Sequence, residues 1–219
     1  MTAFLKEFET RLACNRAAFD AAKANYQPGM SEQEIKKIIL AAWGNPAWEF
    51  SGDVCADSRI DGDATAYIPK AGDALILDLQ PGWADCYADT TRTFFIGEPT
   101  PKQKEAYGAV LDALKAMEQC LATHPRACDL FNVMQETLQK YGLSCPHHAG
   151  HAVGKEKFLQ PQLIAGNDTP LTPGMIIALE PGVYFEGEFG IRVENNYLLT
   201  EDGIKELFNY PLDINYFII

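Results

Sequence analysis

The chain carries the same local pattern twice, about a hundred residues apart, and this repeat is the strongest constraint on its fold. In the first copy, Gly72 is followed six residues later by Asp78, at the end of an apolar run. In the second copy, Gly174 is followed six residues later by Glu180, again at the end of an apolar run. Internal repetition of this kind indicates a structure built from related units. We therefore expect two halves related by a pseudo-twofold axis, with their acid-bearing strands meeting in the middle.

Each of the two acids is followed by a turn and by a return segment with a second acid. In the first half, Pro81-Gly82 predicts the turn, and a return strand predicted over residues 87–95 carries Asp89. In the second half, Glu194 occupies the corresponding place. The repeat thus predicts four carboxylates that point into one site.

A carboxylate at the end of a buried strand loses its hydration, so something must compensate the charge of Asp78. A cation, a hydrogen-bond network or a metal would each do so. For Asp78 alone, a turn or capping role is the simpler interpretation. The second copy of the pattern favours a shared site.

Helical spacing of apolar residues predicts two pairs of helices. The first pair is expected over residues 3–24 and from Ser31 onward, and the second from Thr100 to about residue 124 and then up to Gly142. Ser31 and Thr100 each open a capping box. A short strand is expected around residues 48–50. Helices and strands in this order predict an α+β fold, with helices covering one face of an antiparallel sheet in a single domain, 1–219.

Residues 146–154 contain three of the four histidines of the chain. Histidine is the commonest nitrogen ligand of metals in proteins, and neighbouring glycines allow the backbone to approach a site closely. The alternative is a solvated loop whose histidines have no shared role. The clustering favours a metal site.

Composition and charge exclude several classes of partner. The net charge of −12 and the pI near 4.7 argue against nucleic acid and anionic membranes, which a negative surface repels. The N-terminus does not resemble a secretory signal, and no apolar run is long enough to span a membrane. Six cysteines without C-x-x-C spacing indicate reduced thiols. We expect a cytoplasmic protein.

The chain resembles the pita-bread metallopeptidases, the family of methionine aminopeptidase, aminopeptidase P and prolidase. Five motifs in the family's order carry the resemblance: a helix start at 27–35, one paired acid motif at 77–79 with 87–94, a histidine motif at 147–154, and two glutamate motifs at 179–184 and 190–194. The resemblance covers nearly the whole length. It implies the pita-bread fold without the additional N-terminal domain that relatives usually carry.

The resemblance also implies two divalent metal ions, bound by Asp78, Asp89, His151, Glu180 and Glu194. Asp89 and Glu194 would bridge the ions, with Asp78 on one ion and His151 and Glu180 on the other. The oxygen-rich donor set favours Mn²⁺, with Co²⁺, Zn²⁺ and Fe²⁺ as alternatives. A hydroxide shared by the two ions would attack a peptide carbonyl, and Glu180 would act as general acid and base. The competing interpretation is a set of structural carboxylates in salt bridges.

Within the family, Arg192 and the segment ending at Tyr184 are similar to the aminopeptidase P and prolidase branch. This likeness implies cleavage of an Xaa-Pro bond in a peptide substrate. His147, four residues before His151, matches a histidine that binds substrate and stabilises the tetrahedral intermediate. The sequence leaves the substrate and the oligomeric state open, and a homodimer is one option.

Two positions depart from the family pattern. Phe158 and Asp61 stand where the family places further histidines. Loss of one electrophilic donor costs about 10²–10³ in rate. Two hypotheses follow. The first is a metal-dependent exopeptidase with unusual or reduced activity, and the second is a metal-binding protein with weak or no peptidase activity that recognises a peptide or a protein partner.

Overall fold

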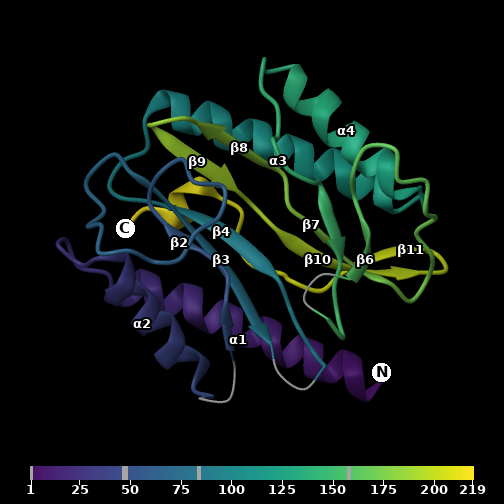
Figure 1. Cartoon of the computed structure of the whole chain (residues 1–219), viewed down its shortest axis with the longest axis horizontal. Helices are drawn as coiled ribbons and strands as arrows, with labels where there is room; N and C mark the ends of the chain where they lie inside the picture. Colours follow the sequence, from purple (N-terminus) through teal and green to yellow (C-terminus); the bar gives the residue numbers. More distant parts are fainter. Residues whose placement is uncertain (1, 46–48, 83–84, 157–158) are drawn as a thin grey trace.

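The four predicted helices form at the expected places in a computed structural model, which describes residues 2–45, 49–82, 85–156 and 159–219. Helices α1 (Ala3–Asn25) and α2 (Glu32–Trp43) form one pair, and α3 (Pro101–Leu121) and α4 (Ala127–Gln139) form the other. Figure 1 shows the two pairs on opposite sides of the strands. The fold is α+β, with antiparallel sheets, as predicted.

The predicted capping boxes set the starts of α2 and α3. The Ser31 hydroxyl accepts a hydrogen bond from the Glu34 N–H, and the Glu34 carboxylate accepts one from the Ser31 N–H. Thr100 and Gln103 make the same reciprocal pair at the start of α3. Helix α4 ends three residues before the predicted stop at Gly142, because the chain leaves the helix through a tight turn first.

The first sheet contains β1 (Glu49–Ser51), β2 (Val54–Cys55), β3 (Ala74–Gly82) and β4 (Thr90–Phe95). Strand β3 pairs antiparallel with the other three. The strand expected around residues 48–50 is β1, and residues 46–48 lie outside the described part of the chain.

Three predictions about this hairpin are wrong. The turn predicted at Pro81-Gly82 is the end of β3, because these two residues lie opposite Phe50 and Glu49 and the pairing with β1 extends the strand. Asp78 therefore lies in the middle of a buried strand, opposite Thr91, and not at its end. The return strand begins three residues later than predicted, at Thr90, so Asp89 lies just before it.

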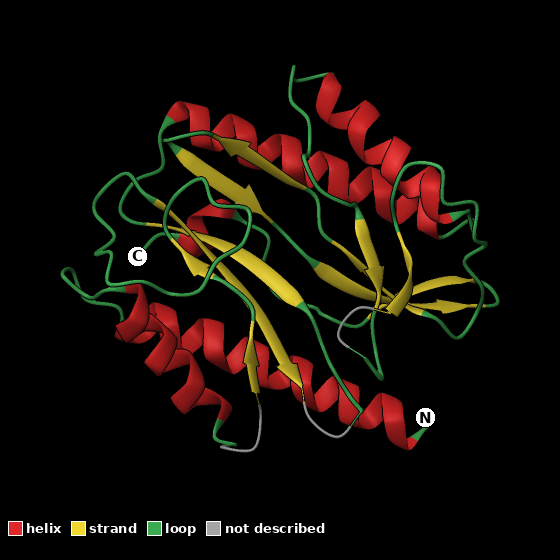
Figure 2. Cartoon of the chain, in the orientation of Figure 1, coloured by secondary structure: helices red, strands yellow, loops and turns green. Residues whose placement is uncertain are grey.

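The second half forms a five-stranded sheet and a separate two-stranded hairpin (Figure 2). The sheet has the order β11 (Gly203–Glu206), β10 (Asn195–Thr200), β7 (Ile176–Leu179), β5 (Gly150–Ala152) and β6 (Leu159–Gln162), and the hairpin joins β8 (Gly182–Phe185) to β9 (Phe189–Arg192). Glu180 lies in the break between β7 and β8, and Glu194 in the break between β9 and β10.

The core joins the two halves. Helix α1 packs on β3 and β4, whereas α3 packs on β7, β8 and β9. The 3₁₀ helix Ile214–Phe217 brings the C-terminus back to β4, where the Ile219 N–H donates to the Phe95 carbonyl over 2.9 Å. All six cysteines are free thiols. Among the described residues, no helix is both long and apolar enough to cross a membrane.

Candidate metal centre

A cavity of about 660 Å³ receives side chains from both halves of the chain. Its lining is dominated by carboxylates and histidines, namely Asp53, Asp61, Asp63, Asp78, Asp89, Glu180, His147, His148 and His151. Arg192 is the one Lys or Arg among the described residues that line it. The charge of the cavity is therefore strongly negative.

The deepest part of the site is a buried cluster of Asp89, His151 and Glu194, whose ligand atoms all lie within 4.8 Å of one another. The Nδ1–H of His151 donates to the Ala152 carbonyl over 2.9 Å. This hydrogen bond directs Nε2 toward the acids, 3.4 Å from Oδ2 of Asp89. Histidines that bind metals are commonly oriented by a bond of this kind to the other ring nitrogen.

The strands of the two halves are joined at this cluster. The Glu194 N–H donates to the Thr91 carbonyl over 3.0 Å, and the Thr91 hydroxyl donates to Oε2 of Glu194 over 2.9 Å. Because Thr91 also lies opposite Asp78 in the first sheet, one threonine links acids from both repeats. The pseudo-twofold arrangement expected from the repeat thus brings the acids together.

Two oxygens of the buried cluster fit a cation. Oδ1 of Asp89 and Oε1 of Glu194 are buried and accept no hydrogen bond from the described residues. Burial raises the pKa of both carboxyls well above its usual range, and neighbouring carboxylates raise it further. Burial also raises the pKa of Asp78 to about 6, although the charge of Arg192 opposes the shift. A divalent cation would remove the repulsion, so the residues present fit a metal.

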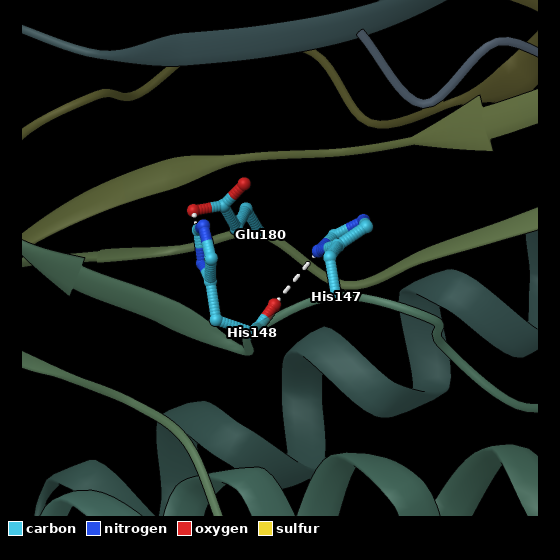
Figure 3. Close-up of side chains that lie close together, drawn as sticks. All are labelled: His147, His148 and Glu180. Atoms are coloured by element: carbon cyan, nitrogen blue, oxygen red, sulfur yellow. Dashed lines mark hydrogen bonds and ion pairs between the residues drawn. The ribbon is translucent and has the colours of Figure 1, made fainter.

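Glu180 faces two histidines across the mouth of this cluster. Its Oε1 lies 3.1 Å from Nδ1 of His148 and 3.6 Å from Nε2 of His151. Burial alone would raise the pKa of Glu180, but the hydrogen bond and charge of His148 and the other histidines lower it to about 2. Figure 3 shows the His148 ring beside the Glu180 carboxylate, with His147 next to it. His147, His148 and Glu180 form a second group of potential ligands.

Arg192, at the end of β9, is buried among acceptors. Its Nη2 donates to Asp53 over 2.8 Å and to Asp78 over 2.9 Å. Its Nη1 donates to the Tyr184 hydroxyl over 2.9 Å and to the Ile60 carbonyl. Burial disfavours the charge, but Tyr184 and the carboxylates raise the pKa of Arg192 well above its usual range. Arg192 is thus a fixed cation beside Asp78.

The Tyr184 hydroxyl connects Arg192 to His147. It lies 3.0 Å from Nε2 of His147, whose Nδ1 lies 2.8 Å from the His148 carbonyl. The carbonyl can only accept, so Nδ1 carries the proton and Nε2 accepts from the tyrosine. Burial lowers the pKa of His147, which favours the neutral ring.

All five predicted metal ligands surround this one site, and the predicted catalytic residues Glu180, His147 and Arg192 lie in it as well. Their roles stay predictions. Asp61 lines the cavity, whereas Phe158 lies outside the described residues.

Sequence reasoning assigned no role to Asp53, Tyr184 or His148. The glycine that precedes Asp53 could have indicated its place. A Cβ atom at residue 52 would lie 2.1 Å from the Asp78 carbonyl oxygen, so only glycine fits there. This close approach pairs the backbones of Asp53 and Asp78.

The fold and the site together define a class: a two-half α+β protein with a buried centre of carboxylates and histidine. The model of metallopeptidase family M24 matches residues 9–201, and the chain belongs to that family. The match confirms the resemblance that the motifs indicated.

Relatives and solved structures agree with this assignment. The chain is 33% identical over 191 residues to the Xaa-Pro dipeptidase of Pyrococcus furiosus, covering 85% of this chain and 52% of that protein. It is 32% identical over 148 residues to the probable dipeptidase PepE of Mycobacterium tuberculosis, covering 66% of this chain and 40% of that one.

Two solved structures are similar across almost the whole chain. The X-Pro aminopeptidase of Thermotoga maritima has a TM-score of 0.92 at 27% identity, covering 99% of this chain and 63% of that one. The prolidase of Pyrococcus furiosus has a TM-score of 0.90 at 27% identity, covering 96% and 65%. The chain thus spans about half the length of the curated relatives it matches.

Proposed function

We propose that the chain is a metallopeptidase that binds two divalent metal ions and cleaves Xaa-Pro bonds. The observation that carries this proposal is the buried cluster of Asp89, His151 and Glu194, with two carboxylate oxygens that accept no hydrogen bond from the described residues. Buried charges are normally paired or bound to metals. The names of two relatives, Xaa-Pro dipeptidase and X-Pro aminopeptidase, support cleavage of an Xaa-Pro bond.

The residues that would hold the ions are Asp78, Asp89, His151, Glu180 and Glu194. Two such ions, when bound, supply Lewis acidity to a peptide carbonyl and lower the pKa of a water molecule so that it can attack near neutral pH. Mn²⁺ is the proposed metal because most of the donors are oxygens.

The chain's own residues position and move protons around this centre. Oε1 of Glu180 is the proposed acceptor of the proton from the attacking water and its donor to the leaving nitrogen. His147 is the proposed partner of the substrate carbonyl. In this structure its Nδ1 faces the His148 carbonyl and its Nε2 faces the Tyr184 hydroxyl, so this role requires one of these two bonds to be exchanged. Arg192 holds Asp78 in one orientation.

A non-catalytic metal-binding protein that recognises a peptide or protein partner is the second candidate. The acid at Asp61, which lines the cavity where the family resemblance implies a histidine, favours it. We expect Asp61→His with Phe158→His to raise kcat/KM on an Xaa-Pro peptide about tenfold if donors are what the site lacks. A fall in kcat/KM would mean that these residues serve another substrate.

We also propose a cytoplasmic location and a single catalytic domain. Six free thiols support a cytoplasmic location. Residues 1–219 are proposed to act as one catalytic domain, and a homodimer remains open to measurement by light scattering.

The test is metal content measured together with peptidase activity. Protein loaded with Mn²⁺ should hold close to two ions per chain by elemental analysis and should release the N-terminal residue from an Xaa-Pro peptide. Asp89→Ala should lose most of the metal and the activity, whereas Glu105→Gln, an exposed acid on α3, should keep both. Retained metal without hydrolysis would favour the non-catalytic candidate, and no bound metal would refute both.

A further inference from the structure

Arg192 is the one Lys or Arg among the described residues that line the cavity, and this limits which substrates the cavity accepts. A dipeptide carries its α-carboxylate one residue beyond the scissile bond, so the carboxylate must enter the cavity with the bond. A carboxylate that leaves water needs charged or N–H donors in return. Arg192 could bind the substrate carboxylate only through an N–H donor that has no other acceptor.

A guanidinium has five N–H donors, and each donor of Arg192 already has an acceptor. Nη2 donates to Asp53 and Asp78, Nη1 donates to Ile60 and Tyr184, and Nε lies 3.4 Å from the Thr91 hydroxyl. The residue is 3% exposed. A substrate carboxylate would have to break one of these bonds and displace a buried carboxylate from its cation.

Two of the histidine rings in the cavity also make hydrogen bonds within the protein. His147 uses Nδ1 on the His148 carbonyl and Nε2 on Tyr184, and His151 uses Nδ1 on the Ala152 carbonyl. The half-buried His148 directs Nδ1 at Glu180. Nε2 of His151 faces Asp89, 3.4 Å from Oδ2, so Nε2 of His148 is the ring nitrogen left in the cavity that could meet a carboxylate.

The loop opposite the histidines adds negative charge. It brings Asp53, Asp61 and Asp63 to the cavity wall, where Asp53 pairs with Arg192 and Asp63 lies 3.6 Å from Nζ of Lys36. Asp53 also holds the loop by accepting from the Gly62 N–H over 2.9 Å. A carboxylate placed near this wall is repelled, whereas a neutral peptide bond or an N-terminal ammonium group is not.

We infer that the site prefers Xaa-Pro peptides in which the proline carboxyl is part of a further peptide bond, and that it discriminates against free Xaa-Pro dipeptides. This inference rests on the proposed peptidase function. It assigns the chain an aminopeptidase substrate class although several relatives are named dipeptidases. Arg192 and Asp53 act as specificity-determining residues, since Arg192 is the one Lys or Arg among the described residues that line the cavity and Asp53 occupies one of its donors.

The test compares Ala-Pro, Ala-Pro amide and Ala-Pro-Ala as substrates of the Mn²⁺-loaded protein. The amide matches the dipeptide in size and lacks its negative charge, so it separates charge from length. We expect kcat/KM to be at least tenfold higher for the amide and the tripeptide than for Ala-Pro. An equal or higher kcat/KM for Ala-Pro would overturn the inference. If His148→Phe then lost the activity on Ala-Pro, His148 would be the donor to the substrate carboxylate.

Substitution of Asp53, which accepts a hydrogen bond from Arg192, tests whether the occupied donors of Arg192 exclude a substrate carboxylate. Asp53→Ala releases one N–H of Nη2 and removes one negative charge, so the ratio of kcat/KM for Ala-Pro over its amide should rise about tenfold. Asp57→Ala is the matched control, because Asp57 lies in the same loop, pairs with Arg59 and does not line the cavity. An unchanged ratio in Asp53→Ala would contradict the inference.

Binding provides a readout that does not depend on turnover. Calorimetry with a ketomethylene isostere of Ala-Pro, as free acid and as amide, should give at least tenfold tighter binding of the amide. If the amide binds better but no peptide is cleaved, the specificity holds and the peptidase function fails. If peptides are cleaved and the free acid binds better, the function holds and the inference fails. Absence of both binding and cleavage refutes both.

Discussion

At the scale of single residues, the Tyr184 hydroxyl holds the orientation of two functional side chains. It accepts from Nη1 of Arg192 and donates to Nε2 of His147, so one oxygen sets the ring orientation and the tautomer of the histidine. A hydrogen bond in such a buried network contributes about 0.5–1.5 kcal/mol net. The removal of this hydroxyl should therefore affect both folding and catalysis.

We predict that Tyr184→Phe lowers kcat/KM on an Xaa-Pro peptide about tenfold, which corresponds to about 1.4 kcal/mol. Loss of the donor to Nε2 should also raise the pKa of His147, which an NMR titration of the histidines would detect. Tyr141→Phe is the control, since the Tyr141 hydroxyl bonds only to the exposed Asp112 on α3. Unchanged activity and an unchanged His147 titration would show that the hydroxyl does not position the ring.

At the scale of elements, the first turn of α2 anchors the loop that forms the acidic wall of the cavity. Glu32 is fully buried and accepts hydrogen bonds of 2.7–2.8 Å from Ala56, Arg59 and Thr65. A helix start thus positions a loop more than twenty residues further along the chain. The capping box at Ser31 fixes where that helix begins.

We predict that Glu32→Gln lowers the free energy of unfolding by about 2–4 kcal/mol, because Gln keeps one acceptor oxygen where Glu32 has two and removes the buried carboxylate that pairs with Arg59, leaving Asp57 as its partner. Glu34→Gln, which changes only the exposed capping box, should cost about 1 kcal/mol or less. Urea denaturation of both variants measures the difference. Equal losses would show that the loop does not depend on Glu32.

At the scale of the whole molecule, the two halves bring carboxyl groups of the same charge together where they meet. Burial raises the pKa of Asp78 to about 6 and raises the pKa of Asp89 and Glu194 well above normal. A carboxyl whose pKa is higher in the folded than in the unfolded state binds protons on folding, so it destabilises the fold when ionised. The metal-free fold should therefore gain stability as pH falls through this range.

We predict that chelator-treated protein becomes more stable by about 1–3 kcal/mol between pH 7 and pH 5. The lowered pKa of His147 opposes part of this gain, because the unfolded state takes up that proton first. Metal-loaded protein should show the opposite slope, since its ligands must stay deprotonated to bind metal. Thermal melting across pH, with and without Mn²⁺, measures both slopes.

Asp89→Asn is the control for the opposite pH dependence of the metal-free and metal-loaded protein. It removes one titrating group from the cluster, so the metal-free variant should be more stable than the wild type at pH 7 and less dependent on pH. A wild-type protein whose metal-free stability falls steadily from pH 7 to pH 5 would contradict the assignment of Asp78, Asp89 and Glu194 to one uncompensated site.

The sequence by itself determined the local elements and the membership of the site. Helix starts depend on a few neighbouring residues, so the capping boxes at Ser31 and Thr100 located α2 and α3 correctly. The repeated acid pattern and the histidine cluster identified the residues that surround the cavity, because these signals lie in the spacing of residues along the chain.

Only the tertiary structure decided how distant segments complete the site. Strand β3 continues through Pro81 and Gly82 because it pairs with β1, and no local signal encodes that partner. Asp53 reaches Arg192 across 139 positions of sequence, and the donors of Arg192 are filled by groups from both halves. Hydrogen-bond saturation is a property of packing between segments, so the substrate preference inferred from it could not be read from the order of residues alone.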